Sequence, residues 1–156
     1  MDLVRLSIGS HDPHLQEFAN TILPVGVFNL SITPGAEIEQ TNQRMVTAYQ
    51  GTWHRRLMPR TVLVFINDDP ARAAEEARDA LTNYWRALEG TLDEEKVRKA
   101  TSNALIGDAK AIAAQMRQRF DPEDRLMLWF DFNNHDSKRV MTNMRDFMTR
   151  VGPEFA

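Results

Sequence analysis

Two short polar stretches of the sequence carry residues that could bind or transform a ligand. In the first, Gly9, Ser10 and His11 follow an apolar run and come just before Pro13, which suits the first turn of a helix. A glycine lets a ligand approach the backbone, and the first N–H groups of a helix attract an anion such as phosphate. The alternative is that these residues only form a tight turn between a strand and a helix.

The second polar stretch contains Asp131, Asn133 and His135, directly after another apolar run. Asp131 could orient His135 as a general base, or the group could line the mouth of a substrate pocket. Trp129 could line the same pocket, because one face of a strand points into the lumen of a barrel. The alternative is that the asparagines shape a turn, while Asp136 or the serine after it caps the next helix.

Other polar residues receive structural interpretations. His11 and His14 are three positions apart, but no third or fourth ligand follows at the spacing of a zinc site, so we predict no metal. At Asp108 a negative charge before a helix opposes phosphate binding. We interpret the residues that stand directly before predicted helices as their caps: Asp12, Thr33, Asp69 and Asp108.

The composition is that of an ordinary globular chain. It has 156 residues, of which 42% are hydrophobic and 26% charged, and this predicts a single domain over residues 1–156. The net charge of −3 gives no reason to expect nucleic acid, and the lack of cysteine excludes a disulfide scaffold. No apolar stretch approaches the roughly 18 residues of a membrane span, and no secretory signal is evident. We therefore expect a cytoplasmic protein with no membrane partner.

Strand-like and helix-like segments alternate along the chain. The apolar run at 126–130 shows no alternation, which predicts a strand buried on both faces. The alternation of strands with helices predicts parallel pairing and right-handed crossovers, with ligands at the carboxyl ends of the strands. We predict strands over 3–8, 25–30, 59–66 and 126–130, helices over 13–22, 34–50, 70–88, 108–120 and 136–155, and a short exposed helix over 92–102.

Four such βα units pose a packing problem. A closed (βα)8 barrel needs about 250 residues, and this chain has 156. The strands therefore form either a small open sheet or half of a barrel, and a half barrel leaves an edge strand that needs cover.

Five segments in this order carry a family resemblance. They are Leu6-Ser-Ile-Gly-Ser10, Val25-Gly-Val-Phe-Asn-Leu30, Thr61-Val-Leu-Val-Phe-Ile-Asn67 with Asp69-Pro70-Ala71, Ala104-Leu-Ile-Gly-Asp108, and Arg125-Leu-Met-Leu-Trp-Phe-Asp131 with a Gly152-Pro-Glu-Phe155 ending. Together they resemble strands five, six and seven, the start of the penultimate helix, and the last strand of bacterial luciferase-like flavin-dependent monooxygenases. The resemblance implies an α/β fold of parallel βα units, the second half of a TIM barrel.

The resemblance also implies a function and a site. It implies a flavin-dependent oxidoreductase or monooxygenase that uses reduced FMN, or the deazaflavin F420, on a small organic substrate, with a flavin reductase as electron source. The family's phosphate-binding turn corresponds to Gly9, Ser10 and His11, although its further hydroxyl is replaced near Pro13. The last strand's outlet would face the substrate, through Trp129, Asp131 and Asn133.

Strands one to four of the family have no counterpart in this chain. In the family that half brings much of the isoalloxazine pocket and, where one exists, the histidine used in acid–base chemistry, so the catalytic residues stay unassigned. The chain resembles a natural short form, a truncated product or an excised half. The resemblance implies closure by a homodimer or by pairing with a missing amino-terminal half. The alternative is a non-catalytic half barrel that binds flavin or another anion, or that serves as an oligomerisation module.

Overall fold

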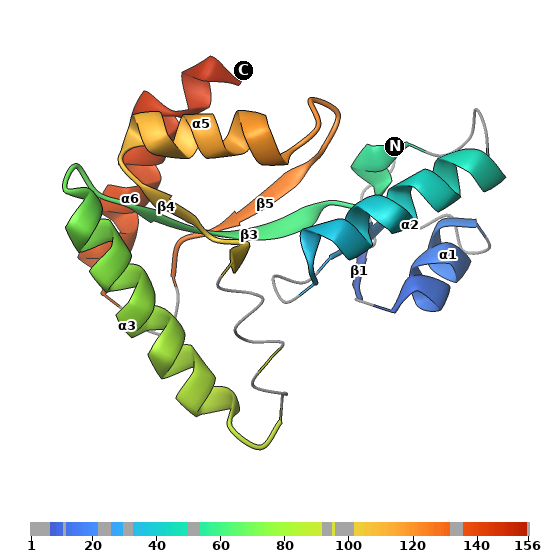
Figure 1. Ribbon diagram of the computed structural model, residues 1–156, viewed down its shortest axis with the longest axis horizontal. Coiled ribbons are helices and arrows are strands. Elements are labelled where there is room, and N and C mark those ends of the chain that lie inside the picture. The colour runs from blue at the N-terminus through green and yellow to red at the C-terminus, as the bar shows by residue number, and fades with distance from the viewer. Residues whose placement is uncertain are drawn as a thin grey trace, which may run out of the picture. The chain divides into compact units, whose positions relative to one another are not determined.

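The computed structural model describes residues 7–10, 12–21, 26–29, 33–49, 54–91, 95, 102–131 and 136–155. Its elements follow the predicted alternation of strands with helices (Figure 1). They are β1 (Ser7–Gly9), α1 (Pro13–Thr21), β2 (Gly26–Phe28), α2 (Gly35–Ala48), the 3-10 turn η1 (Arg55–Leu57), β3 (Arg60–Ile66), α3 (Pro70–Leu88), β4 (Leu105–Gly107), α5 (Ala109–Arg119), β5 (Leu126–Trp129), α6 (Ser137–Arg150) and the 3-10 turn η2 (Gly152–Glu154). The exposed helix predicted over 92–102 lies almost wholly outside the described residues.

The chain divides into two compact units. One comprises Met1–Thr61 with Pro122–Met127, and the other comprises Val62–Asp121 with Leu128–Ala156. In the described part of the chain, none of the helices combines the length and apolar character that crossing a membrane requires.

In the first unit the strands lie parallel, side by side. β1 pairs with β2 so that Gly9 lies opposite Phe28. Asn29, directly after β2, forms a parallel bridge to Arg60: its N–H donates to the Pro59 carbonyl at 2.7 Å and its carbonyl accepts from Thr61 at 2.9 Å. The predicted parallel pairing of consecutive strands is therefore confirmed here.

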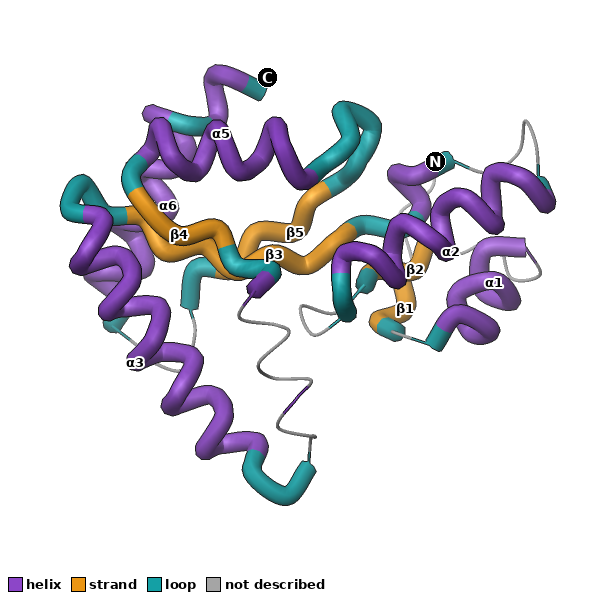
Figure 2. The backbone as a smooth tube through the Cα atoms, in the orientation of Figure 1, coloured by secondary structure: helices purple, strands orange, loops and turns teal. Residues whose placement is uncertain are grey.

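β3 lies between β4 and β5 in a three-stranded parallel sheet (Figure 2). Every residue of β3 is buried. Leu63 and Phe65 pack against Ala77, Ala80 and Leu81 of α3. Figure 1 shows α5 on the other side of this sheet. β3 is thus the core strand, apolar and covered on both faces.

β4 is a strand that the sequence did not predict. We interpreted this segment only as the start of a helix, but Val64 pairs with Leu105 and Ile66 with Gly107. Gly107 has a φ of +141°, a conformation that side chains rarely adopt, and an added Cβ would lie 3.0 Å from that of Ala111. A glycine is therefore required where this short strand turns into α5.

The prediction that residues 126–130 form a strand buried on both faces is wrong. Burial alternates along β5: Leu126 and Leu128 are half-buried, whereas Met127 and Trp129 are exposed. β5 is at the edge of its sheet, after β3 and β4. An unbroken apolar run shows that both faces of a strand are apolar, but a neighbouring layer must also be present to cover them.

The helix starts follow local side-chain chemistry. Asp69 Oδ1 accepts from Ala71 N at 2.9 Å, and Asp108 Oδ1 accepts from Ala111 N at 2.7 Å, which confirms both predicted caps. The cap predicted at Thr33 is wrong, because α2 begins one residue later with Pro34 as its N-cap and no side-chain cap bond. Proline fixes a suitable φ there without a side-chain acceptor.

Candidate functional site

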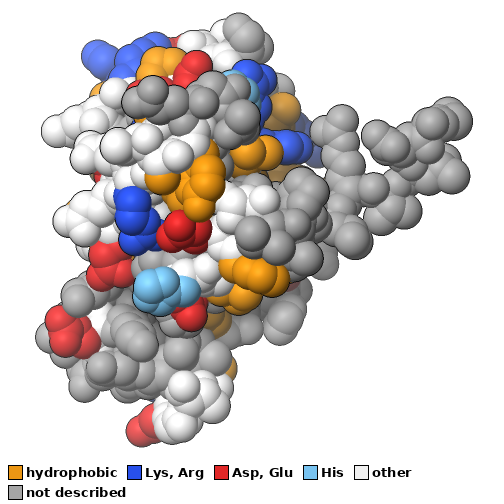
Figure 3. Space-filling view, turned by 90° about the vertical axis from the view of Figure 1, so that its right-hand side faces the viewer, with side chains coloured by type: hydrophobic (Ala, Val, Ile, Leu, Met, Phe, Trp, Pro, Cys, Tyr) orange, Lys and Arg blue, Asp and Glu red, His pale blue; other side chains and the backbone are white. Residues whose placement is uncertain are grey.

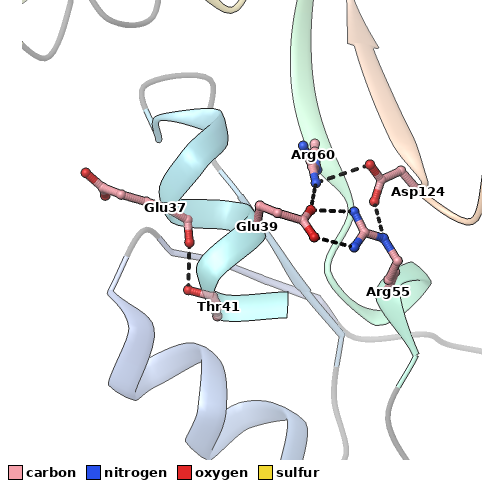
Figure 4. Close-up of polar contacts among 6 residues, drawn as sticks. All are labelled: Glu37, Glu39, Thr41, Arg55, Arg60 and Asp124. Atoms are coloured by element: carbon pink, nitrogen blue, oxygen red, sulfur yellow. Dashed lines mark hydrogen bonds and ion pairs between the residues drawn. The ribbon is translucent and has the colours of Figure 1, made fainter. Parts of the chain in front are cut away.

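Four charged side chains meet at the amino-terminal end of β3 (Figure 4). Arg55 binds Glu39 of α2 through two N–H···O bonds of 2.7 and 3.0 Å. Asp124 accepts from Arg55 Nε at 3.0 Å and lies 3.2 Å from Arg60 Nη2. Only 3% of the Asp124 side chain and 7% of the Arg60 side chain are exposed. Two positive and two negative groups therefore neutralise one another, and all of them except Glu39 are largely shielded from water.

The pKa shifts of this cluster follow from its contacts. The hydrogen bond from Arg55 is the main cause that lowers the Glu39 pKa from 4.5 to about 2. The same bond is the main cause that raises the Arg55 pKa, whereas burial is the main cause that lowers the Arg60 pKa. The carboxylate of Glu39 is therefore held ionised across the ordinary pH range.

Acid should weaken the fold through Glu39. Its pKa is lower in the folded chain, so its stabilising effect is complete above pH 4.5 and is lost as the pH falls toward about 2. Because 40% of its side chain is exposed, we expect a loss of only about 1 kcal/mol over this range. Urea unfolding at several pH values, compared with a Glu39→Gln variant, measures this. The variant should have a flatter profile, and identical profiles would contradict the assignment.

The turn between β1 and α1 is fixed by its own side chains. Ser10 is buried, and its Oγ accepts from Asp12 N at 3.0 Å. Asp12 Oδ1 in turn accepts from His14 N at 2.9 Å, which bears out its predicted role at the start of α1. Gly9 is exposed at the end of β1, and His11 lies outside the described residues. The Ser10 hydroxyl hydrogen still has donor capacity toward a ligand.

A buried amide pair holds this turn against the end of β2. Gln16 Nε2 donates to the Ser10 carbonyl at 2.9 Å and to Asn29 Oδ1 at 2.6 Å. Asn29 is fully buried, and its Nδ2 has no hydrogen-bond partner among the described residues. Sequence reasoning missed both amides, because their pairing joins residues 13 positions apart and leaves no local pattern. Their effect is to place a second donor, the Asn29 amide, near Ser10.

Trp129 is the last residue of β5, and Asp131 lies two residues beyond it. The ring of Phe130 packs edge-on against Phe147 of α6, with ring centroids 5.7 Å apart. Since successive side chains of an extended chain point to opposite sides, Trp129 points away from the side on which Phe130 meets α6. Asn133 and His135 lie outside the described residues. The pocket-lining role of Trp129, Asp131 and Asn133 stays a prediction.

A cavity of about 410 Å³ opens on the helix side of the second unit. Arg139 of α6 donates to the Ile66 carbonyl at 3.1 Å and pairs with Glu76 of α3 at 2.5 Å. The buried Asn143 has an Oδ1 atom with no hydrogen-bond partner among the described residues. The lining residues are Phe65, Glu76, Phe130, Asp136, Arg139, Val140 and Asn143.

No cluster in the described ranges is arranged to bind a metal: no three His, Asp or Glu side chains meet there. His11 lies outside those ranges. Three features of the described residues remain as candidates for binding a ligand: the turn after β1, the exposed face of β5 and the helix-side cavity.

Comparison with known proteins identifies the fold. A scan against protein-family models finds no match, and no curated protein matches. Among solved structures, monooxygenase RslO1 from Streptomyces bottropensis is 19% identical with a TM-score of 0.77, over 97% of this chain and 48% of its own. The oxygenating constituent of 3,6-diketocamphane monooxygenase from Pseudomonas putida, a type II Baeyer–Villiger enzyme in complex with FMN, is 11% identical with a TM-score of 0.63, over 96% and 48%. Long-chain alkane monooxygenase LadA is 14% identical with a TM-score of 0.53, over 95% and 40%.

The chain has the fold of half a luciferase-like barrel. It spans about half the length of RslO1 and of the diketocamphane enzyme, in agreement with the half barrel that the resemblance implied. In barrels of this kind ligands bind at the carboxyl ends of the strands. The turn after β1 and the end of β5 are at such ends.

The charged cluster does not lie at the carboxyl ends of strands, so by this rule we interpret it as a structural feature, and the cavity is a separate candidate site. The Glu39–Arg55–Arg60–Asp124 cluster lies where β3 begins, on the amino-terminal face that serves stability. The 410 Å³ cavity lies among the helices that cover the outside of the strands.

Proposed function

We propose that this chain is the carboxyl-terminal half of a luciferase-like flavin-dependent monooxygenase and that it holds the phosphate of FMN at the turn after β1. The likeness of the fold to three monooxygenases supports the general activity. The observation that carries the assignment of the turn is the pair of buried donors, Ser10 Oγ and Asn29 Nδ2, at the carboxyl ends of two parallel strands.

The described residues fit a phosphate in part. The Ser10 hydroxyl and the Asn29 amide can donate to phosphate oxygens, and Gly9 and His11 would contribute backbone contacts. The Asp12 carboxylate opposes them, because it already occupies the amino-terminal end of α1. A bound reduced flavin supplies the electrons for reaction with dioxygen, and the protein orients it and excludes water.

The same proposal assigns the substrate side. Trp129, Asp131 and Asn133, at the end of β5, would face a small organic substrate, and a flavin reductase would supply reduced FMN. F420 is the alternative cofactor, and it too carries phosphate for the same turn to bind.

Flavin titration tests the role of Ser10. We expect Ser10→Ala to weaken FMN binding at least roughly tenfold, because a hydrogen bond to a charged group contributes about 1.5–3 kcal/mol. Asp12→Asn should strengthen FMN binding several-fold by removing a like charge. Fluorescence titration measures both, in parallel with riboflavin, which lacks the phosphate and should show no change.

The matched control is Ser137→Ala, an exposed serine at the start of α6. It should bind FMN as the unchanged chain does. Unchanged FMN affinity in Ser10→Ala would remove the phosphate site from the proposal.

A second candidate is a non-catalytic half barrel that serves oligomerisation. The observation in its favour is that polar groups of the turn already bind one another: Ser10 Oγ accepts from Asp12 N, and the Asp12 side chain caps α1. A folded chain that binds neither FMN nor F420 supports this candidate over the first.

A further inference from the structure

The helix-side cavity has both apolar and polar walls, and all of its lining residues belong to the second compact unit. Its aromatic walls are Phe65, near the end of β3, and Phe130, directly after β5. Its polar groups include Glu76 of α3 and Arg139 and Asn143 of α6. A cavity volume of about 410 Å³ lies within the range of roughly 300–1,000 Å³ that is typical of small-molecule sites. Aromatic walls with a few polar groups are also typical of such sites.

Exposed apolar side chains of the first unit lack this setting. Leu15 and Phe18 of α1 and Val46 of α2 are each at least 40% exposed. Figure 3 shows the side of the molecule on which α1 and α2 lie in Figure 1, where hydrophobic side chains reach the surface among charged ones. Scattered apolar side chains of this kind are normal for a protein surface and define no class of ligand.

Asn143 is the polar residue of the cavity that most needs a partner. It is only 4% exposed, and its Oδ1 atom has no hydrogen-bond partner among the described residues. A buried acceptor without a partner destabilises the fold, because it has lost its hydrogen bonds to water. A ligand that donates a hydrogen bond to Asn143 Oδ1 would remove this cost.

The charges around the cavity favour a neutral ligand. Glu76 Oε2 accepts from Arg139 Nη2 at 2.5 Å, and Glu76 Oε1 accepts from Asn67 Nδ2 at 3.0 Å. Asp136 is exposed, and its Oδ1 accepts from the Arg139 backbone N–H at 3.0 Å. An anion would therefore meet the Asp136 carboxylate, and a cation would compete with Arg139 for Glu76. Either charge would also lose its hydration on entering the cavity.

One hydroxyl group can bind to Arg139 and Asn143 together. The two residues are four positions apart in α6, so they are neighbours on one face of the helix. Among the described residues, the side-chain hydrogen bonds of Arg139 use Nε and Nη2, which leaves the N–H groups of Nη1 as donors. A hydroxyl oxygen can accept from Nη1 while its hydrogen is donated to Asn143 Oδ1.

We propose that this cavity binds a small neutral phenol. The aromatic ring lies against Phe65 and Phe130, and the hydroxyl group lies between Arg139 and Asn143. The aromatic side chains provide apolar contact area, while the hydroxyl supplies the donor that Asn143 lacks. The proposal goes beyond the flavin function and does not depend on it, because none of these residues belongs to the turn after β1.

Isothermal titration calorimetry near neutral pH tests the site with two probes. 2-Naphthol carries the hydroxyl group, and 2-methylnaphthalene has the same rings and nearly the same size but cannot form hydrogen bonds. We expect 2-naphthol to bind at least roughly tenfold more tightly, because it pairs a buried acceptor that the other probe leaves unpaired. Asn143→Leu removes that acceptor at similar volume. It should weaken 2-naphthol binding by about tenfold and change 2-methylnaphthalene binding by less than about twofold.

Two further variants complete the test. Asn83→Leu, at an exposed position of α3, is the matched control and should leave both affinities unchanged. Val140→Phe adds a ring to a residue that lines the cavity, so it should abolish binding of both probes, and it tests the site even if Asn143→Leu does not fold. Absence of saturable 2-naphthol binding, equal affinities for the two probes, or unchanged 2-naphthol affinity in either cavity variant would overturn the proposal. No flavin is used, so this failure is distinguishable from failure of the FMN titration.

Discussion

Replacing Asp124 with asparagine should lower the free energy of unfolding by about 3 kcal/mol, because breaking a buried ion pair leaves an uncompensated charge. The Asp124 side chain is 3% exposed and contacts Arg55 Nε at 3.0 Å and Arg60 Nη2 at 3.2 Å. Without its charge, Glu39 alone faces two guanidinium groups, one of them almost fully buried. Urea unfolding followed by circular dichroism measures the change, with an unaltered slope showing that compactness is the same.

Asp79→Asn is the matched control. Asp79 pairs with Arg78 at 3.5 Å on the surface of α3, where both side chains are mostly exposed. Exposed pairs contribute about 0–1 kcal/mol, so its effect should be much smaller. A second test adds Arg60→Met to the Asp124→Asn variant. This double variant should regain part of the lost stability, because the excess positive charge is removed. Equal effects of Asp124→Asn and Asp79→Asn would contradict a buried cluster.

The elements of this fold were predictable where local chemistry sets their limits. α3 begins at Pro70 after the Asp69 cap, as predicted, and it ends just before Gly90, whose φ is +84°. Such signals act within a few residues, so the sequence alone is sufficient to locate them. These signals also set the spacing of the βα units along the chain, and four such units are too few for a closed (βα)8 barrel.

Burial and long-range pairing were not predictable from local pattern. The charged cluster joins a helix, a turn and two strand starts, with Arg55 and Asp124 separated by 69 positions. The Gln16–Asn29 pair, likewise, requires β2 to lie beside the turn after β1. At the candidate site, the sequence singled out Ser10 and Trp129, whose roles stay predictions, but the buried Asn29 donor became evident only from the packing of the strands.

β3 is buried throughout and β5 is partly exposed, so truncating side chains in the two strands should change stability by different amounts. Leu63→Ala should destabilise the chain by about 3 kcal/mol, because a fully buried leucine truncated to alanine typically loses 2–5 kcal/mol. Leu63 is 1% exposed and packs in the cluster against α3. Trp129→Ala should change the stability by only about 1 kcal/mol or less, because 44% of Trp129 is exposed. Thermal and urea unfolding at low protein concentration measure both.

Trp129 also links stability to closure of the barrel. Its side chain lies on the opposite side of the chain from the Phe130 ring, which packs against α6, so the homodimer that the resemblance implies would cover it. In that case the effect of Trp129→Ala should grow with protein concentration, as it does for any residue buried by association. The effect of Leu63→Ala should not change with concentration, because α3 of the same chain already covers Leu63. A large effect of Trp129→Ala in the dilute monomer would instead mean that β5 is a core strand, as its apolar run first indicated.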